Sequence, residues 1–151
     1  MNSINPVDIK NKLVGTWRLL YTEIRYVNNQ IGDSLFGTDA TGYLLYNKDG
    51  YMSVAILFPN LPKSGLSAEH FRLTNFDKET SLFYCGRYTI YPDKLIHHIE
   101  ISSHPHRPEL SGNQERLFEF RENKLSLSVE SELGGKQMIF RLIWELIQDY
   151  W

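Results

Sequence analysis

Hydrophobic and polar residues alternate along most of this chain with a period of two, which is typical of β-strands whose two faces meet different surroundings. The alternating segments are rich in β-branched and aromatic residues. The strands predicted from this pattern span residues 17–27, 42–46, 51–58, 82–90, 94–102, 114–121, 124–131 and 136–147. Between the second and third strands, Asp49-Gly50 favours a tight hairpin, because Gly adopts the positive φ that such turns require.

Two segments have helical spacing instead. Pro6 precedes residues 7–14, where apolar residues recur every three or four positions, and proline is well tolerated at the start of a helix. Residues 68–77 have similar spacing, after Pro59 and Pro62 have ended the third strand. We therefore predict a short N-terminal helix, which would plug one end of a barrel, and one helix in the middle segment.

Short strands with short connections favour an all-β fold, an eight-stranded antiparallel up-and-down barrel. A chain of 151 residues, of which 42% are hydrophobic, is long enough to bury a core without disulfides or a structural metal. We expect one domain over residues 1–151.

Composition and charge argue against several classes of protein. The formal net charge is −2 and Lys and Arg are scattered, whereas a nucleic-acid-binding domain carries a basic patch. No apolar run approaches the roughly 20 residues of a membrane-spanning helix. The single cysteine, Cys85, cannot form an internal disulfide, and the first residues lack the features of a signal peptide. We expect a cytoplasmic monomer or homodimer with no nucleic-acid partner and no membrane insertion.

Several short motifs follow one another in an order that resembles a known family. They are Leu13-Val-Gly-Thr-Trp17, Gly42-Tyr-Leu-Leu-Tyr46, Asp49-Gly-Tyr-Met-Ser-Val54, Tyr84-Cys-Gly-Arg-Tyr88, His97-His-Ile-Glu100 with Ser103 and Pro105, Gln114-Glu-Arg116 and Leu142-Ile-Trp144. With these motifs the chain resembles, over nearly its whole length, the bacterial and fungal lipocalin-like domain family of the calycin group. The Thr-Asp-Tyr motif and the cysteine pair of secreted lipocalins are missing, which argues against extracellular transport.

The resemblance implies a lipocalin-like barrel with an interior pocket, and a role in binding or transforming small, mostly apolar molecules. It also implies structural roles for Gly15 and Trp17, since the Gly-x-Trp motif of lipocalins places the indole at the closed end of the barrel. The segment from Pro59 to Asp77 would form the lid or mouth, although its helix would fit against the outer wall equally well.

One parity of each barrel strand faces the interior, and those residues either fill the barrel or line a pocket. From the parity that we assign inward, we expect contact with a ligand from Tyr21, Met52, Val54, Tyr84, Tyr88, Phe118, Phe140 and Trp144. The inward tyrosines favour a pocket over a filled barrel, since a buried phenol needs a hydrogen-bond partner. The predicted function is binding of a small hydrophobic molecule in the barrel interior.

Four of the five histidines lie within ten residues, at positions 97, 98, 104 and 106. Alternation over residues 94–102 separates an inward set, Leu95, His97, Ile99 and Ile101, from an outward set, Ile96, His98, Glu100 and Ser102. A single bulge would exchange the two faces and place His98 and Glu100 inside, near Arg116. A satisfied core histidine beside a solvated one is the alternative without chemistry.

The candidate catalytic residues are His97, His98, Glu100 and Arg116. As an alternative to binding alone, a histidine would act as acid or base while Arg116 and a tyrosine stabilise charge, giving an isomerase, a cyclase or a proton-transfer catalyst. Arg116 would equally well seal the barrel. Adjacent strand histidines point to opposite faces and no zinc-type motif accompanies them, so we expect no metal and no cofactor.

Overall fold

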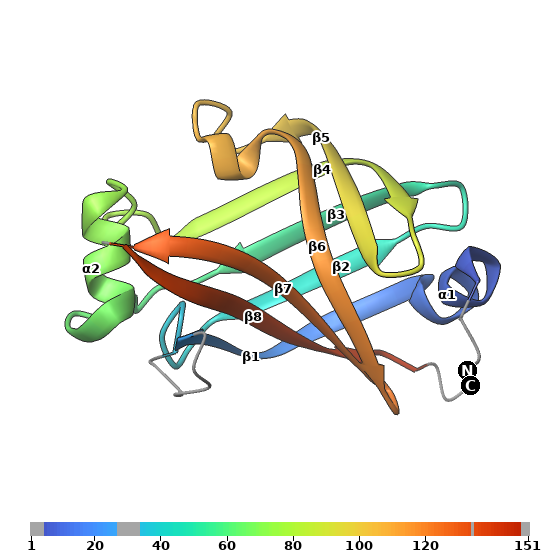
Figure 1. Ribbon diagram of the computed structural model, residues 1–151, viewed down its shortest axis with the longest axis horizontal. Coiled ribbons are helices and arrows are strands. Elements are labelled where there is room, and N and C mark those ends of the chain that lie inside the picture. The colour runs from blue at the N-terminus through green and yellow to red at the C-terminus, as the bar shows by residue number, and fades with distance from the viewer. Residues whose placement is uncertain (1–4, 27–33, 134, 149–151) are drawn as a thin grey trace.

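A computed structural model of the chain describes residues 5–26, 34–133 and 135–148. Its elements, in chain order, are α1 (Pro6–Leu13), β1 (Gly15–Tyr26), β2 (Thr41–Tyr46), β3 (Tyr51–Leu57), α2 (Gly65–Leu73), β4 (Ser81–Ile90), β5 (Lys94–Ser102), the 3₁₀-helix η1 (Pro108–Leu110), β6 (Gly112–Arg121), β7 (Lys124–Leu133) and β8 (Lys136–Leu146). The strands form a closed barrel in which each pairs with the next and β8 pairs with β1 (Figure 1).

The predicted fold is therefore confirmed, with all strand pairs antiparallel and two α-helices. Along β3, buried Met52, Val54 and Ile56 alternate with residues of lower burial, as a period of two requires. Val27, the last residue of the first predicted strand, lies outside the described residues.

Helix α1 is fixed at both of its ends. Asn5 caps the helix by accepting a hydrogen bond from the backbone N–H of Asp8 at 2.9 Å. At the other end, the indole N–H of Trp17 donates to the carbonyl oxygen of Leu13 at 2.8 Å. This bond ties α1 to β1, and Figure 1 shows α1 at one end of the barrel and α2 at the other.

Helix α2 lies earlier in the chain than the predicted range of residues 68–77. It begins at Gly65 and ends at Leu73, because Asn75 has a φ of 57°, a left-handed conformation that cannot continue a helix. Phe71 is among its buried residues, so this face of α2 packs against the barrel end.

Two shifts in register change which residues face the interior. In β1 the pairing with β8 shifts between Leu19 and Tyr21, so that Thr22 is buried whereas Tyr21 is 54% exposed. The prediction that Tyr21 faces the interior is wrong for this reason. A second shift, in the pairing of β4 with β5, turns Ile101 outward with 61% exposed, which also corrects its predicted direction.

Gly86 accommodates this second shift. It is buried and pairs with Ile99, and a Cβ at this position would overlap the backbone carbonyl oxygen of His98. Only a residue without a side chain fits here while β5 keeps its position. Gly86 therefore helps to determine where the bulge of β5 lies relative to its histidines.

Replacing Gly86 by alanine is expected to lower the free energy of unfolding by about 1–3 kcal/mol, because the new methyl group must displace the β5 backbone. Urea denaturation measures the change. Ser81→Ala, at an exposed position of the same strand, is the control and is expected to stay within about 0.5 kcal/mol of wild type. Equal stability of Gly86→Ala and wild type would contradict the close approach.

Candidate functional site

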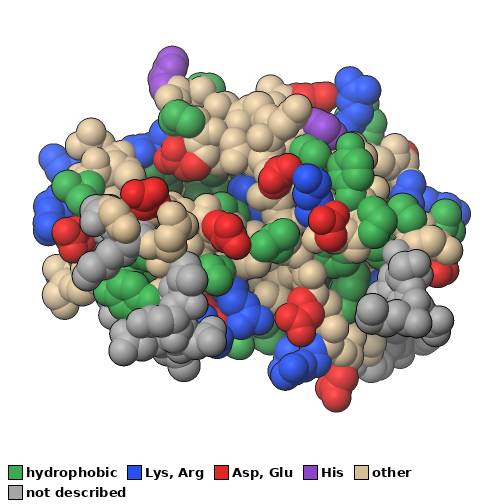
Figure 2. Space-filling view, viewed as in Figure 1, with side chains coloured by type: hydrophobic (Ala, Val, Ile, Leu, Met, Phe, Trp, Pro, Cys, Tyr) green, Lys and Arg blue, Asp and Glu red, His purple; other side chains and the backbone are tan. Residues whose placement is uncertain are grey.

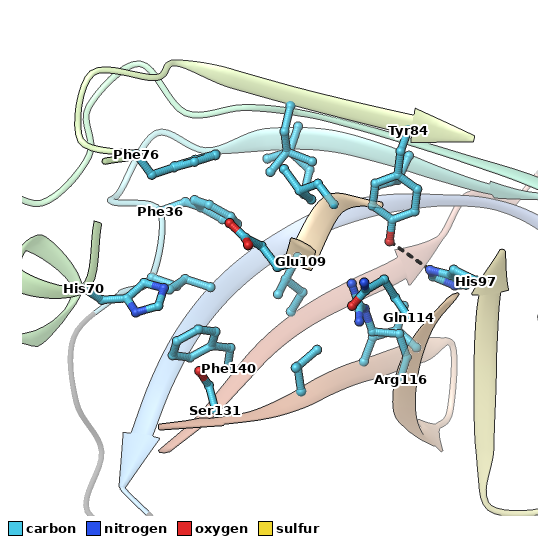
Figure 3. A pocket seen from close by; sticks show the side chains of 18 of the residues that line it. Phe36, His70, Phe76, Tyr84, His97, Glu109, Gln114, Arg116, Ser131 and Phe140 are labelled. Carbon is cyan, nitrogen blue, oxygen red and sulfur yellow. Dashed lines mark hydrogen bonds between the residues drawn. The ribbon is translucent and has the colours of Figure 1, made fainter. Parts of the chain in front are cut away.

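The barrel encloses a cavity of about 390 Å³ on the side of α2. Its lining comes from strands β2 to β8, from α2 and from η1, and most of the lining residues are apolar. Figure 3 shows the polar side chains of Tyr84, His97, Gln114 and Arg116 gathered at one side of the cavity and aromatic rings at the other. The cavity thus has an apolar part and a polar part.

Toward α1 the interior is filled by side chains. Trp17, Met52 and Tyr88 are buried there and are not among the described residues that line the cavity. The hydroxyl of Tyr88 donates to the carbonyl oxygen of Asn47 at 2.6 Å, and Trp17 packs near Phe120 with ring centroids 6.4 Å apart. This packing is consistent with the sealing role that the family resemblance implies for Trp17.

Gly15 lies where α1 turns into β1. Its φ of 147° is one that residues with side chains rarely adopt, and a Cβ here would lie 3.0 Å from the Leu146 side chain. The position therefore favours glycine for both conformation and space, which agrees with a structural role.

Aromatic side chains surround the mouth of the cavity. Phe36 stacks on Phe71 of α2 with ring centroids 5.7 Å apart, and Phe71 packs against Phe76 at 5.4 Å. The ring of His70, also from α2, meets Phe140 of β8 edge-on at 4.8 Å. Helix α2 thus contributes directly to the lining, which agrees with the predicted mouth segment from Pro59 to Asp77.

His97 is the centre of the polar side of the cavity. It is 1% exposed and lies between two tyrosines: the Tyr46 hydroxyl is 2.6 Å from Nε2, and the Tyr84 hydroxyl is 2.8 Å from Nδ1. The three side chains come from β2, β5 and β4. Simple alternation along β5 predicted that His97 faces the interior, and a bulge would have placed His98 there instead. In the structure His97 faces the interior.

The hydrogen bonds of this group assign the tautomer of His97. A neutral imidazole donates through one nitrogen and accepts through the other. Tyr46 is 1% exposed, and within the described part of the chain its hydroxyl proton has no acceptor besides Nε2. We therefore assign Tyr46 as donor to Nε2 and the Nδ1–H as donor to the Tyr84 oxygen. The hydroxyl hydrogen of Tyr84, which lines the cavity, is then free to point toward a bound molecule.

Burial keeps this group uncharged. It lowers the pKa of His97 well below its usual range, and the charge of Arg116 lowers it further. Burial also raises the pKa of Tyr46 well above its usual range, with Tyr84 adding to the effect. At neutral pH the imidazole and the Tyr46 phenol are both neutral, so the charge beside them is the guanidinium of Arg116.

Arg116 lies on the inward parity of β6 and lines the cavity. Its Nη1 donates to the carbonyl oxygen of Glu115 at 2.9 Å. Its neighbour on the same face, Gln114, donates through Nε2 to the carbonyl oxygens of Pro108 and Ser111, each at 2.7 Å. Gln114 therefore holds η1 in place, and the side chain of Arg116 remains available to the cavity.

His98 and Glu100 lie on the outer face of β5. His98 contacts the Thr89 hydroxyl at 2.7 Å and the Asn113 side-chain oxygen at 2.8 Å, while Glu100 forms an ion pair with Arg87 at 3.1 Å. The structure does contain a bulge in β5, but it lies beyond the histidines and leaves His98 and Glu100 outside. The expectation that these two residues belong to an interior catalytic site is corrected accordingly.

A family profile described as a lipocalin-like domain matches residues 14–147. The match covers every strand of the barrel, in the region where the motifs of the chain occur. The chain belongs to the lipocalin-like domain family. No curated protein matches the sequence significantly.

In this lipocalin-like barrel the predicted ligand-binding residues fall into three groups. Lining the cavity are Val54, Tyr84, Phe140 and Trp144. Inward-facing but outside the described lining are Met52, Tyr88 and Phe118. Tyr21 is on the outer surface because of the register shift in β1.

Several lining or supporting residues were missed from the sequence. Tyr46 shares the parity of buried Leu44, so extending the alternation of β2 would have found it. His70, Glu109 and Gln114 approach the cavity from α2, η1 and the start of β6. No local sequence pattern predicts that these residues line the cavity, because their positions depend on how the connecting segments fold over the barrel end.

Two nitrogen atoms of lining residues are buried without a hydrogen-bond partner among the described residues: Nδ1 of His70 and Nε1 of Trp144. Burial lowers the pKa of His70. A buried polar atom without a partner costs free energy, so a polar group brought by a bound molecule would be favourable at this cavity.

No three His, Cys, Asp or Glu side chains in the described ranges come together in a way that would hold a metal ion. His104 lies 3.1 Å from Glu79, away from His97 and His98, and His106 is exposed.

No helix in the described part of the chain is long and apolar enough to cross a membrane. Figure 2 shows one face of the molecule, with acidic and basic side chains interspersed.

The free energy of unfolding of wild type is expected to fall as the pH decreases below about 6.5. The unfolded chain binds a proton at His97 there, whereas burial opposes protonation in the folded barrel. The slope from this group is at most about 1.4 kcal/mol per pH unit. Denaturant unfolding between about pH 8 and pH 5 measures it.

In the same experiment, His97→Gln is expected to have a lower free energy of unfolding at high pH, because the imidazole's hydrogen bonds with Tyr46 and Tyr84 are lost. Its free energy of unfolding should also lack the pH dependence that comes from His97. His106→Gln, at an exposed position, is the control and should keep the wild-type slope. Equal slopes in wild type and His97→Gln would mean that the folded barrel accepts the proton at His97.

Proposed function

We propose that this protein binds a small, mostly apolar molecule in the interior of its barrel. The observation that carries the proposal is the cavity of about 390 Å³, lined mostly by apolar side chains with a few polar groups at one side. Small-molecule sites have this character and span about 300–1,000 Å³. Membership of the lipocalin-like domain family supports the same function.

The arrangement of the interior supports binding over a purely structural barrel. An eight-stranded barrel can be filled entirely by side chains. In this barrel, side chains such as Trp17 fill only the end near α1. The smaller side chains of Val54 and Val129 leave a cavity between that end and α2. The rings of Phe36 and Phe71 at the mouth would shield a bound apolar molecule from water.

Location and assembly complete the proposal. We propose a cytoplasmic protein, because its single cysteine cannot form an internal disulfide. We further propose that it binds no nucleic acid, because its net charge is small and its basic residues are scattered. We also propose that it is a monomer or homodimer.

Filling the cavity is expected to abolish binding. Val129→Trp places an indole among the lining residues, whereas Glu130→Trp places it on the exposed face of the same strand. Titration with the neutral fluorescent probe N-phenyl-1-naphthylamine should show binding to wild type and Glu130→Trp, and at least tenfold weaker binding to Val129→Trp. Equal binding by the two variants would place the probe outside the barrel.

A second candidate function is catalysis on the same bound molecule, as an isomerase, cyclase or proton-transfer catalyst. The observation that favours it is the chain of hydrogen bonds from Tyr46 through His97 to Tyr84, with Arg116 on the same cavity wall. The Tyr84 hydroxyl and the guanidinium would both stabilise negative charge that develops on a substrate oxygen.

The pKa values of this group narrow the chemistry. Net donation of a proton from Tyr84, relayed through His97, would leave a phenolate at Tyr46, whose pKa burial raises well above its usual range. Stabilisation of an oxyanion by hydrogen bonds, while the substrate rearranges, therefore fits better than net proton donation. Such a mechanism would assist the cyclisation or isomerisation of a molecule that carries a carbonyl group.

The catalytic alternative is tested with the compound that co-purifies with the protein from its own host. Native mass spectrometry should detect the bound compound, and chromatography of the extracted compound should separate the converted isomer from its precursor, because the two have the same mass. Wild type should yield the converted isomer, whereas Tyr84→Phe and His97→Gln should hold the precursor and convert it roughly 100-fold more slowly. His98→Gln is the matched control, because the adjacent histidine lies on the outer face. Wild-type turnover by His97→Gln would leave binding as the function.

A further inference from the structure

The guanidinium of Arg116 forms no ion pair with the part of the chain that the structure describes. It is half-buried on the inner face of β6, and no carboxylate of the described residues lies within 4.0 Å of it. Its hydrogen bond to the Glu115 carbonyl engages one nitrogen, whereas a guanidinium carries five N–H donors. A cation that is partly removed from water without a counter-charge is destabilising unless another group compensates it.

The acidic side chain next to Arg116 in the chain and those that line the cavity are engaged elsewhere or exposed. The carboxylate of Glu115 lies on the outer face of β6, where it pairs with Lys94 at 2.9 Å. Glu109 lines the cavity from η1 and lies 3.6 Å from Arg107. Glu132, at the far end of β7, lines the cavity but is exposed. Within the described residues, the counter-charge for Arg116 is therefore not supplied by the chain.

The Tyr84 hydroxyl supplies a second donor at the same wall. With the tautomer assigned above, the Nδ1–H of His97 donates to the Tyr84 oxygen, so the hydroxyl hydrogen of Tyr84 is free to donate to a molecule in the cavity. Figure 3 shows Tyr84, His97 and Arg116 on the same side of the cavity, with Phe36, Phe76 and Phe140 on the other. The polar side thus offers a positive charge and a directed hydroxyl donor.

We infer that this cavity selects an apolar molecule that carries a carboxylate, held by the guanidinium of Arg116 and the hydroxyl of Tyr84. The inference rests on the proposed binding function and names its ligand class. A carboxylate neutralises the guanidinium and matches its planar pair of donors, and its free lone pairs accept from the tyrosine. The apolar part of the molecule then extends toward α2, between the phenylalanine rings.

A neutral ligand fits this wall less well. An ester or an alcohol accepts hydrogen bonds but leaves the charge of Arg116 without a counter-charge, and His97 is neutral and cannot replace it. Hydrogen bonds between charged partners are stronger than those between neutral ones. The predicted consequence is a preference for the ionised acid over its neutral ester.

The test compares cis-parinaric acid, a polyene carboxylate whose fluorescence rises on binding, with its methyl ester, at pH 7.5. Wild type should bind the acid roughly ten- to hundredfold more tightly than the ester. Arg116→Met should lower the affinity for the acid to about that for the ester. Tyr84→Phe should remove part of the preference. Arg18→Met, which removes an exposed arginine of β1, is the control and should match wild type.

The comparison of acid with ester in wild type needs no variant, so it decides the question even if Arg116→Met fails to fold. Equal affinities, or a preference that survives in folded Arg116→Met, overturn the inference while binding of N-phenyl-1-naphthylamine keeps the proposed function. If wild type binds neither polyene probe nor N-phenyl-1-naphthylamine, the proposed function itself is wrong.

Discussion

Closure of the sheet between β1 and β8 is the constraint on which the other features of this protein depend. The two strands pair from Trp17 opposite Leu146 to Tyr26 opposite Met138, so the sheet has no open edge between them. Once the sheet is closed, every inward side chain shares one enclosed volume whose size is determined by the number of strands. Trp17 and Tyr88 fill the end near α1, whereas the smaller side chains of Val54 and Val129 leave room for the cavity toward α2, where phenylalanine rings border it.

Enclosure also determines the chemistry of the polar residues inside. An imidazole that is removed from water is stabilised when both of its nitrogens have hydrogen-bond partners, and His97 has one tyrosine on each side. The same burial lowers the pKa of His97 and favours the neutral ring. The imidazole therefore orients the Tyr84 hydroxyl through a hydrogen bond and adds no charge to the cavity wall. The guanidinium of Arg116 carries a positive charge and lines the cavity, so this residue gives the wall its positive potential.

Binding and catalysis would use the same wall in different ways. A ligand that brings its own negative charge finds Arg116 and Tyr84 already arranged to hold it. A substrate that develops negative charge only during reaction would find the same two donors favouring its transition state. The same geometry supports both functions. Whether the protein only binds its ligand or also converts it depends on whether the bound molecule can rearrange over a low energy barrier.

The candidate site was only partly predictable from the sequence. Alternation placed His97, Tyr84 and Arg116 on inward parities, and the structure brings all three to the cavity wall. Alternation failed at Tyr21 and Ile101, because a single extra residue in a strand reverses every later side chain and leaves no mark in the hydrophobic pattern.

The sequence by itself determined the strand count, their antiparallel order and the family, because alternation, turn residues and short motifs are properties of neighbours along the chain. Only the tertiary structure decided that the Tyr46 and Tyr84 hydroxyls meet the two nitrogens of His97, that Arg116 forms no ion pair with the described residues, and that α2 and η1 border the cavity. These contacts join residues that are far apart in the chain, and their distances depend on where the strands shift register and on how the barrel closes.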